Sequence, residues 1–433
     1  MKRIALLFGW LLILPGLARA QTTDDTQARL RALEDRIIAL EGELRALKAA
    51  QAAAPPAESA AKPAEQPAPA TTPPEQAAAS TQPAVSQPAP QVVATSTNPT
   101  QLPVYGGAST AAKILNPDIG VIGDFIGAAG RDPNRHMPAL EMHESEVGLQ
   151  AIIDPYARGD FFLTFGQEGV DLEEGYITFT SLPAGFVAKV GKMRSAFGVV
   201  NTLHNHNLPW IDRPLVTESL VGGEDGISDA GLSVSRILPA PKGIFLEATT
   251  QLYRGDAGGV FHSTRRGDLL AVGRLRGYGD LSESTNLDLG FSYARGHNDV
   301  GTAFRTQLFG ADATLRWKPL RRAIYHNFLL RSELIWSQRQ ELTSVEKAFG
   351  VYTAADYRLN RRWTLGGRYD RSGQAQYAAL TDSGFSPVIT YWPSEFSQIR
   401  GQYRFTRYAD GRSGNDLMFQ FLFILGAHGA HPF

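Results

Sequence analysis

The chain contains no cysteine among its 433 residues, which excludes a disulfide framework and a metal site built from thiolates. After Gln21 it also lacks any long hydrophobic run, because charged residues or glycines interrupt every apolar stretch, so we expect no transmembrane helix in the mature chain. The net charge is only −1, which gives no overall attraction to nucleic acid. No nucleophile elbow, phosphate-binding loop or His-Glu-x-x-His motif is present, so we expect neither an enzyme nor a cofactor.

The first twenty residues have the features of a cleaved secretion signal. Lys2 and Arg3 are followed by an apolar run over 4–14 and by the small-residue exit Ala18-Arg19-Ala20. We therefore expect residues 1–20 to be removed and the mature chain to begin near Gln21. An exported chain without disulfides suits a Gram-negative envelope.

Residues 22–50 show a heptad repeat. Apolar residues recur at spacings 3-4-3-4-3, and the flanking charged residues form three pairs of opposite sign, which favours a parallel coiled coil. The stretches 29–34 and 36–41 resemble the Arg-h-x-x-h-Glu pattern of three-stranded coiled coils, which implies a homotrimer. The alternative is one amphipathic helix packed on a domain. The predicted oligomerisation residues are Leu30, Leu33, Ile37, Leu40, Leu44 and Leu47.

Residues 51–103 consist mainly of Ala, Pro, Gln, Thr and Ser, a composition typical of a disordered or polyproline-like linker. Such a linker could hold the coiled coil in the periplasm, where contact with peptidoglycan is one possible role.

Residues 104–433 predict an all-β, sixteen-stranded antiparallel transmembrane barrel, with no helix in this part of the chain. Apolar and polar residues alternate clearly in 304–317, as expected for a barrel with a lipid-facing outside and a wet lumen. The alternative is a soluble β-sandwich or β-helix. The predicted strands are 118–126, 141–153, 157–166, 171–180, 185–194, 229–238, 243–254, 268–279, 285–296, 303–318, 325–340, 347–358, 361–372, 384–392, 395–408 and 415–431.

An even strand count places both chain ends on the periplasmic side of an outer membrane. The short connections, such as Asp154-Pro155-Tyr156 and Pro393-Ser394, then fall on that same side. Phe433 ends the chain, and a terminal aromatic resembles the signal by which the barrel assembly machinery recognises a last strand.

The longest connection, 195–228, is the third on the opposite side. It contains enough apolar residues to pack inside a barrel, and we predict that it narrows the pore. The residues assigned to this constriction are His204, His206, Trp210, Asp212, Arg213, Glu218, Glu224 and Asp225.

The segment Val190-Gly-Lys-Met-Arg-Ser-Ala-Phe-Gly198, followed by Asp-Arg-Pro and a glycine-rich return, resembles the phosphate-selective porin O and P family of trimeric outer-membrane porins. The resemblance implies passive diffusion of small hydrophilic or ionic solutes through a trimer. Ala196 stands where that family usually has proline, and a lysine-rich ladder is missing, so phosphate specificity is not implied.

Acidic residues gather in the first half of the barrel and in the long connection, whereas arginines gather in the second half. Opposed across a lumen, the two sets predict a transverse field that selects solutes by charge. The alternative is a set of ordinary salt bridges that plug or stiffen the barrel. The predicted lumen arginines are Arg274, Arg276, Arg316, Arg331, Arg368, Arg400 and Arg404.

The histidine pairs His204/His206 and His428/His431 are candidate metal ligands, because imidazole and nearby carboxylates together suit zinc. Three other functional hypotheses remain as alternatives to a porin. One is a zinc-uptake channel, a second is a tether that links the outer membrane to the cell wall through the coiled coil, and the third is a barrel hydrolase.

Overall fold

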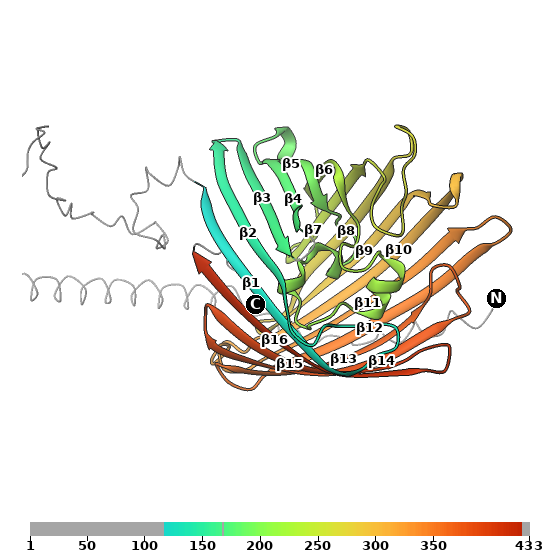
Figure 1. Cartoon of the computed structure of the whole chain (residues 1–433). Coiled ribbons are helices and arrows are strands. Elements are labelled where there is room, and N and C mark those ends of the chain that lie inside the picture. The colour runs from blue at the N-terminus through green and yellow to red at the C-terminus, as the bar shows by residue number, and fades with distance from the viewer. Residues whose placement is uncertain (1–116, 167–168, 427–433) are drawn as a thin grey trace, which may run out of the picture. The chain divides into compact units, whose positions relative to one another are not determined.

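The computed structural model describes residues 117–166 and 169–426, which form one closed antiparallel barrel (Figure 1). Each strand pairs with its neighbours in sequence, and β1 pairs with β16 to close the ring. The strands are β1 (Asp118–Arg131), β2 (Glu141–Asp154), β3 (Ala157–Gly166), β4 (Gly169–Phe179), β5 (Phe186–Arg194), β6 (Ser228–Leu238), β7 (Ile244–Tyr253), β8 (Leu270–Ser282), β9 (Thr285–Asn298), β10 (Gly301–Trp317), β11 (Asn327–Gln340), β12 (Val345–Arg358), β13 (Trp363–Gly373), β14 (Thr381–Ser394), β15 (Ser397–Arg407) and β16 (Ser413–Gly426).

The predicted count of sixteen antiparallel strands is confirmed. Most boundaries agree within three residues; β1 runs on to Arg131, beyond the predicted end at 126. The predicted signal peptide, coiled coil and linker, together with His428, His431 and Phe433, lie outside the described residues.

The barrel has two rims. At the terminal rim, where β1 begins and β16 ends, most connections are short, such as 155–156, 239–243, 283–284 and 395–396. At the loop rim the connections include 132–140, 254–269 and the long segment 195–227. Among the described residues, no helix is long and apolar enough to cross a membrane.

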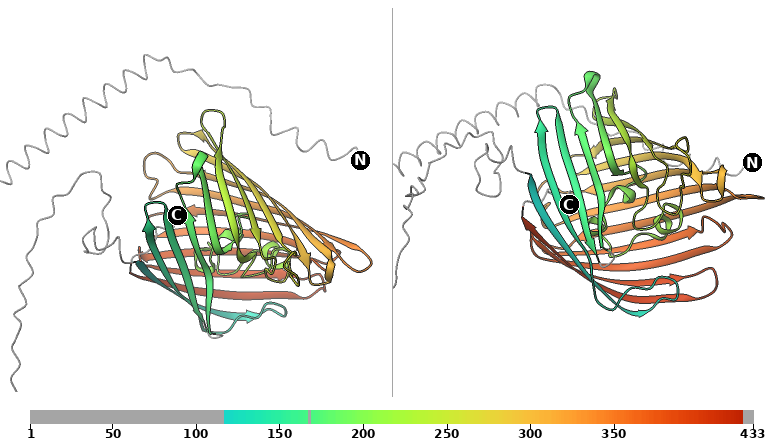
Figure 2. Two further views of the ribbon diagram at one scale, coloured as in Figure 1. Left: turned by 90° about the horizontal axis from the view of Figure 1, so that it is seen from above. Right: turned by 45° about the horizontal axis from the view of Figure 1, so that its top comes forward.

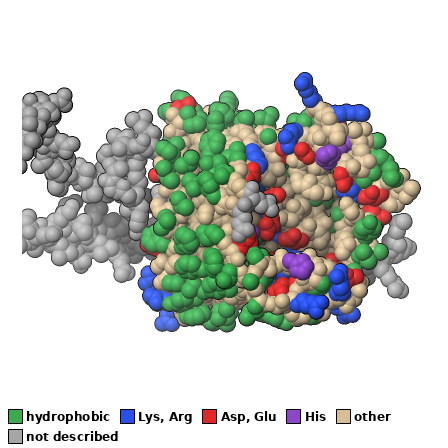
Figure 3. All heavy atoms as spheres, in the orientation of Figure 1, with side chains coloured by type: hydrophobic (Ala, Val, Ile, Leu, Met, Phe, Trp, Pro, Cys, Tyr) green, Lys and Arg blue, Asp and Glu red, His purple; other side chains and the backbone are tan. Residues whose placement is uncertain are grey.

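The two faces of the sheet differ in polarity as the alternation predicts. On β10, Phe309 is exposed on the outside, whereas Thr306, Asp312 and Thr314 face inward and are buried. Large apolar side chains cover the outside over the strands at the left of Figure 3, and charged side chains gather in the hollow. An apolar outer surface with a polar interior is typical of a barrel that spans a lipid membrane.

The segment 195–227, called the inserted loop from here on, folds inside the ring of strands (Figure 2). It contains two short 3₁₀ turns, η2 (Val200–Thr202) and η3 (Asn205–Asn207), and one helix, α3 (Leu215–Leu220). The expectation of no helix in this part of the chain is therefore wrong. A helix of six residues, fewer than two turns, is too short to produce a clear 3.6-residue pattern in the sequence.

Candidate functional site

The base of the inserted loop is closed by Asn201. Its side-chain amide donates to the backbone carbonyls of Ser195 (3.0 Å) and Ile227 (3.1 Å), and its oxygen accepts from the Ile227 N–H at 2.7 Å. Gly226 passes this side chain with a φ of +57°, and a Cβ there would lie 2.1 Å from Asn201 Oδ1. Asn201 thus joins the two ends of the loop where they leave β5 and β6.

Trp210 is the apolar centre of the inserted loop and is completely buried. Its ring makes an edge contact with Tyr352 of β12 at 5.3 Å between centroids, and the Arg368 guanidinium lies 4.8 Å from its ring centre. The loop packs on a patch of inward-facing apolar residues on the wall, which include Val272, Ala294, Leu308, Ile335, Ala348, Tyr352, Ala354 and Val388. The predicted packing of this segment inside the barrel is therefore what the structure shows.

Asp212 joins the inserted loop to three arginines. Its carboxylate lies 3.0 Å from Arg368, 3.1 Å from Arg135 and 3.3 Å from Arg404, and it also accepts from Gln402 at 2.6 Å. Burial on its own raises the pKa of Asp212, but the three guanidinium groups outweigh burial and hold the pKa well below its usual range. The carboxylate therefore stays ionised at any physiological pH.

Backbone groups of the loop are also held by the wall. Glu333 of β11 accepts from the N–H groups of Val199 and Val200, both at 2.7 Å. Arg274 of β8 donates to the Gly198 carbonyl at 2.7 Å and pairs with Asp312 at 2.9 Å. These bonds fix the first turn of the loop over the middle of the barrel wall.

All seven predicted lumen arginines lie in the inward-facing register, and all have partners. Arg400 donates to the Trp210 carbonyl (3.2 Å) and to Gln420 (2.6 Å), and Arg404 pairs with Asp416 at 2.5 Å. Arg274, Arg368, Arg400 and Arg404 thus hold the inserted loop; the last three are buried, and the Arg274 side chain is 9% exposed. Asp212 touches its arginines directly, so this part of the charge pattern is a salt-bridge cluster instead of two separated walls.

Three of the seven arginines lie toward the terminal rim and remain partly open to solvent. Arg276 and Arg316 share Asp288 at 2.6 and 3.6 Å, and Arg331 lies 3.6 Å from Asp356. The side chains of these three arginines are 40%, 34% and 19% exposed, in that order. They are the most exposed members of the set.

The other predicted loop residues have different surroundings. Arg213 donates to the Leu203 carbonyl (2.7 Å) and braces the loop internally; burial lowers its pKa to about 10. Burial raises the pKa of Glu218, although Arg135 lies 3.5 Å away. Glu224 is exposed and 3.7 Å from His143, and a hydrogen bond from this imidazole lowers the pKa of Glu224. Asp225 is exposed, and its backbone carbonyl accepts from Arg194.

The two histidines of the loop contact glutamates on β2 and β4. His204 Nδ1 lies 2.6 Å from Glu146 and its Nε2 lies 2.9 Å from Glu174. His206 Nδ1 lies 3.3 Å from Glu144. Burial on its own lowers the pKa of His204, but hydrogen bonds with Glu146 and Glu174 and the charge of Glu173 outweigh burial and raise the pKa to about 10.

Several residues that hold the loop were missed in the sequence, namely Asn201, Gln402, Glu333 and the inward apolar patch. The patch does leave a signal. Leu308, Ile335 and Val388 stand in the polar register of their strands, where a simple wet lumen predicts polar residues. An apolar residue in that register indicates a surface on which another segment packs.

Comparison with solved structures places this architecture among known folds. The chain resembles the anion-selective porin from Comamonas acidovorans with a TM-score of 0.51 and 10% identity, over 71% of this chain and 99% of that chain. It resembles the in-vitro folded OmpT, an outer membrane protein of Vibrio cholerae, with a TM-score of 0.50 and 9% identity, over 71% and 97% of the two chains. The chain has a porin fold.

Sequence comparison adds one relative, an uncharacterized protein of Aquifex aeolicus (strain VF5). It is 29% identical, and the match covers 77% of this chain and 83% of the relative. No family model matches the chain. The porin fold is therefore assigned from the similarity to solved structures. The likeness to the phosphate-selective porin O and P family stays a prediction.

Proposed function

We propose that this protein is an outer-membrane porin through which small hydrophilic or ionic solutes diffuse passively, with the inserted loop as its constriction. The observation that carries the proposal is the loop itself. It is fixed inside a closed barrel by Trp210, Asp212 and the wall arginines, which supports its role as the constriction. The porin fold and the apolar outer face support a place in the outer membrane.

The first test of this proposal is single-channel recording. The purified full-length protein is inserted into a planar bilayer, and current steps and reversal potentials are measured across a salt gradient. We expect resolved steps with ohmic conductance. Folded barrels that insert without conducting would contradict a diffusion porin and favour an anchoring role.

The exposed arginines near the terminal rim supply the selectivity element of the proposal. A unit charge about 4 Å from a solute ion is worth about 1 kcal/mol even in water. Replacing Arg316 or Arg331 by glutamate reverses one such charge, and we expect the permeability ratio to shift several-fold toward cations. The reversal potential measures the shift. Arg316→Lys keeps the charge and should leave the ratio unchanged; an unaltered potential in both glutamate variants rejects this selectivity element.

We also propose that the protein is a trimer and that its N-terminal region extends into the periplasm. The heptad repeat over 22–50 supports the trimer. Deleting residues 22–103 separates the porin from the tether. A porin should still conduct after the deletion, and current steps that keep arriving in threes would show that the barrel itself trimerises. A deletion that leaves conduction intact but removes attachment of the envelope to the cell wall would favour the tether as a second role.

A further inference from the structure

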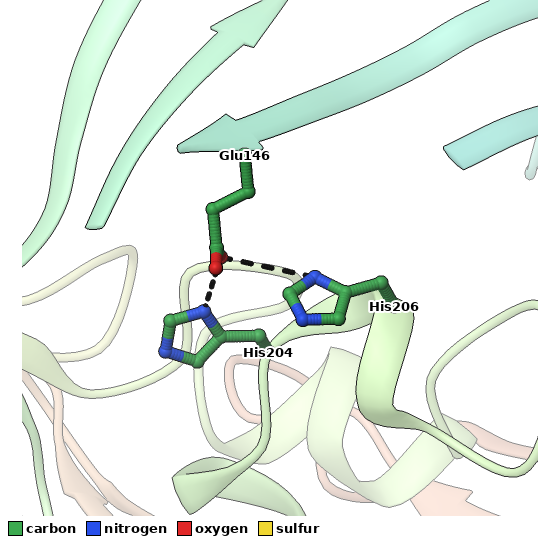
Figure 4. Close-up of side chains that lie close together, drawn as sticks. All are labelled: Glu146, His204 and His206. Carbon is green, nitrogen blue, oxygen red and sulfur yellow. Dashed lines mark hydrogen bonds and ion pairs between the residues drawn. The ribbon is translucent and has the colours of Figure 1, made fainter. Parts of the chain in front are cut away.

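His204 and His206 lie beside Glu146 in a buried cluster that joins the inserted loop to β2 (Figure 4). The two rings come from the loop and the carboxylate comes from the wall, and one ligand atom from each residue lies within 4.8 Å of the others. We propose that these three residues bind a divalent transition metal ion of the zinc class, which ties the acidic side of the barrel to the loop.

The geometry supports a shared ion. The Nδ1 atoms of His204 and His206 lie 2.6 and 3.7 Å from the same oxygen, Glu146 Oε2. Zinc binds histidine nitrogen and carboxylate oxygen at about 2.0–2.2 Å, which places tetrahedral ligand atoms about 3.3–3.6 Å apart. The three atoms therefore need to move by less than about 1.5 Å to surround one ion. Glu144 Oε1 lies 3.3 Å from His206 Nδ1 and Glu173 Oε2 lies 3.4 Å from His204 Nδ1, so either carboxylate can supply a fourth ligand.

The surroundings of the cluster also fit a metal site. A histidine that binds metal through one nitrogen usually gives its other N–H to a carboxylate, which fixes the ring. His204 has this arrangement, because its Nε2 lies 2.9 Å from Glu174 Oε2 while its Nδ1 faces Glu146. Phe162 packs against the edge of the His204 ring at 5.1 Å between centroids and restricts its rotation.

Charge gives a third argument. Glu144, Glu146, Glu173 and Glu174 converge here, and the Arg194 guanidinium pairs with Glu173. Buried carboxylates in such excess need compensating positive charge, which protonated imidazole or a bound metal ion supplies. Two imidazole nitrogens with carboxylate oxygen suit zinc better than calcium or magnesium, which prefer oxygen ligands alone. The side chains of His204, Glu173 and Glu174 are 9%, 12% and 11% exposed, which gives an ion a way in, whereas the Glu146 side chain is 3% exposed.

A cobalt titration tests the proposal. The full-length protein is purified in detergent, stripped with EDTA, dialysed and titrated with Co²⁺, whose visible absorption reports nitrogen and oxygen ligands; Zn²⁺ is then added as competitor. We expect one saturable site per chain from which Zn²⁺ displaces Co²⁺. The double variant His204→Ala/His206→Ala should lose the site, and Glu174→Gln, which removes the carboxylate behind His204, should weaken it about 10- to 100-fold.

Two control variants separate this cluster from other histidines. His428→Ala/His431→Ala removes the second histidine pair of the sequence, and His136→Ala removes an exposed ring in another loop. Both should bind Co²⁺ as the wild type does. Loss of the site in the 428/431 variant but not in the 204/206 variant would overturn the proposal.

A measurement on unmutated protein covers the case in which the double variant fails to fold. X-ray absorption at the zinc edge is recorded on the zinc-loaded wild-type protein and counts the imidazole ligands directly. We expect two histidine ligands, with oxygen completing the coordination. Wild-type protein that binds neither ion, or bound Zn²⁺ with fewer than two histidine ligands, means that protonated imidazole alone balances the carboxylates. These readouts do not involve conduction, so the metal site and the porin proposal can fail separately.

Discussion

Replacing Trp210 by alanine is expected to lower the free energy of unfolding by about 3–5 kcal/mol, because the side chain is completely buried and its removal leaves a cavity. The same change removes the ring that contacts Tyr352 and Arg368 and so loosens the loop from the wall. We therefore expect a larger single-channel conductance and noisier open states. Urea unfolding in detergent measures the first effect and planar-bilayer recording measures the second.

Trp336→Ala is the matched control for this experiment. Trp336 lies on β11, but it faces outward and is 41% exposed. Its removal takes away the same number of atoms without touching the inserted loop, so conductance should stay at the wild-type value. An unchanged conductance in Trp210→Ala, with a folded barrel, would show that the loop does not limit the passage of ions.

Asp212→Asn is expected to lower the free energy of unfolding by a similar amount, because it removes a buried negative charge. The substitution leaves the buried Arg368 and Arg404 and the half-buried Arg135 around a neutral amide, and removing one partner of a buried ion pair usually costs about 3–5 kcal/mol. The loop should detach more often, and bilayer recordings at neutral pH should show frequent steps to a higher conductance.

The same carboxylate predicts a pH dependence. Its pKa is lower in the folded protein than the value of about 3.9 in an unfolded chain, so its contribution to stability is complete above about pH 4 and is lost as the pH falls through the folded pKa. Wild-type conductance should be steady from about pH 7 to pH 5 and rise only in stronger acid. Asp212→Asn should show the high-conductance steps at every pH. Asp225→Asn makes the same charge change at an exposed site of the same loop, and it should behave as wild type.

Strand number, strand order and the side of each connection could be read from the sequence, because residues alternate with period two and the turns are rich in proline. The lumen arginines could be placed in the inward register by the same alternation. Their partners could not be predicted. Asp212 reaches Arg368 and Arg404 from more than 150 residues away, and no local pattern reports such a contact.

The histidine cluster shows the same limit in another form. The His-x-His spacing of His204 and His206 identified candidate ligands, but their geometry depends on η3, a single turn within an irregular loop. Their partners on β2 and β4 are brought close only by closure of the barrel. The sequence could therefore indicate the two histidines as candidate ligands, but it could not indicate which carboxylates surround them.

The inserted loop also constrains the order in which the barrel can form. Its partners include residues on β2, β4, β8, β11, β12, β13 and β15. Arg404 of β15 contacts both Asp212 of the loop and the Arg135 carbonyl, which is 269 residues before it in the chain. Bringing such distant residues together costs loop-closure entropy before their contacts contribute any stability. The loop can complete its fold only after β15 has joined the sheet. Burial of Trp210 is thus a late event in assembly, and its fluorescence, in a variant that keeps Trp210 alone of the six tryptophans, offers a reporter for docking of the loop.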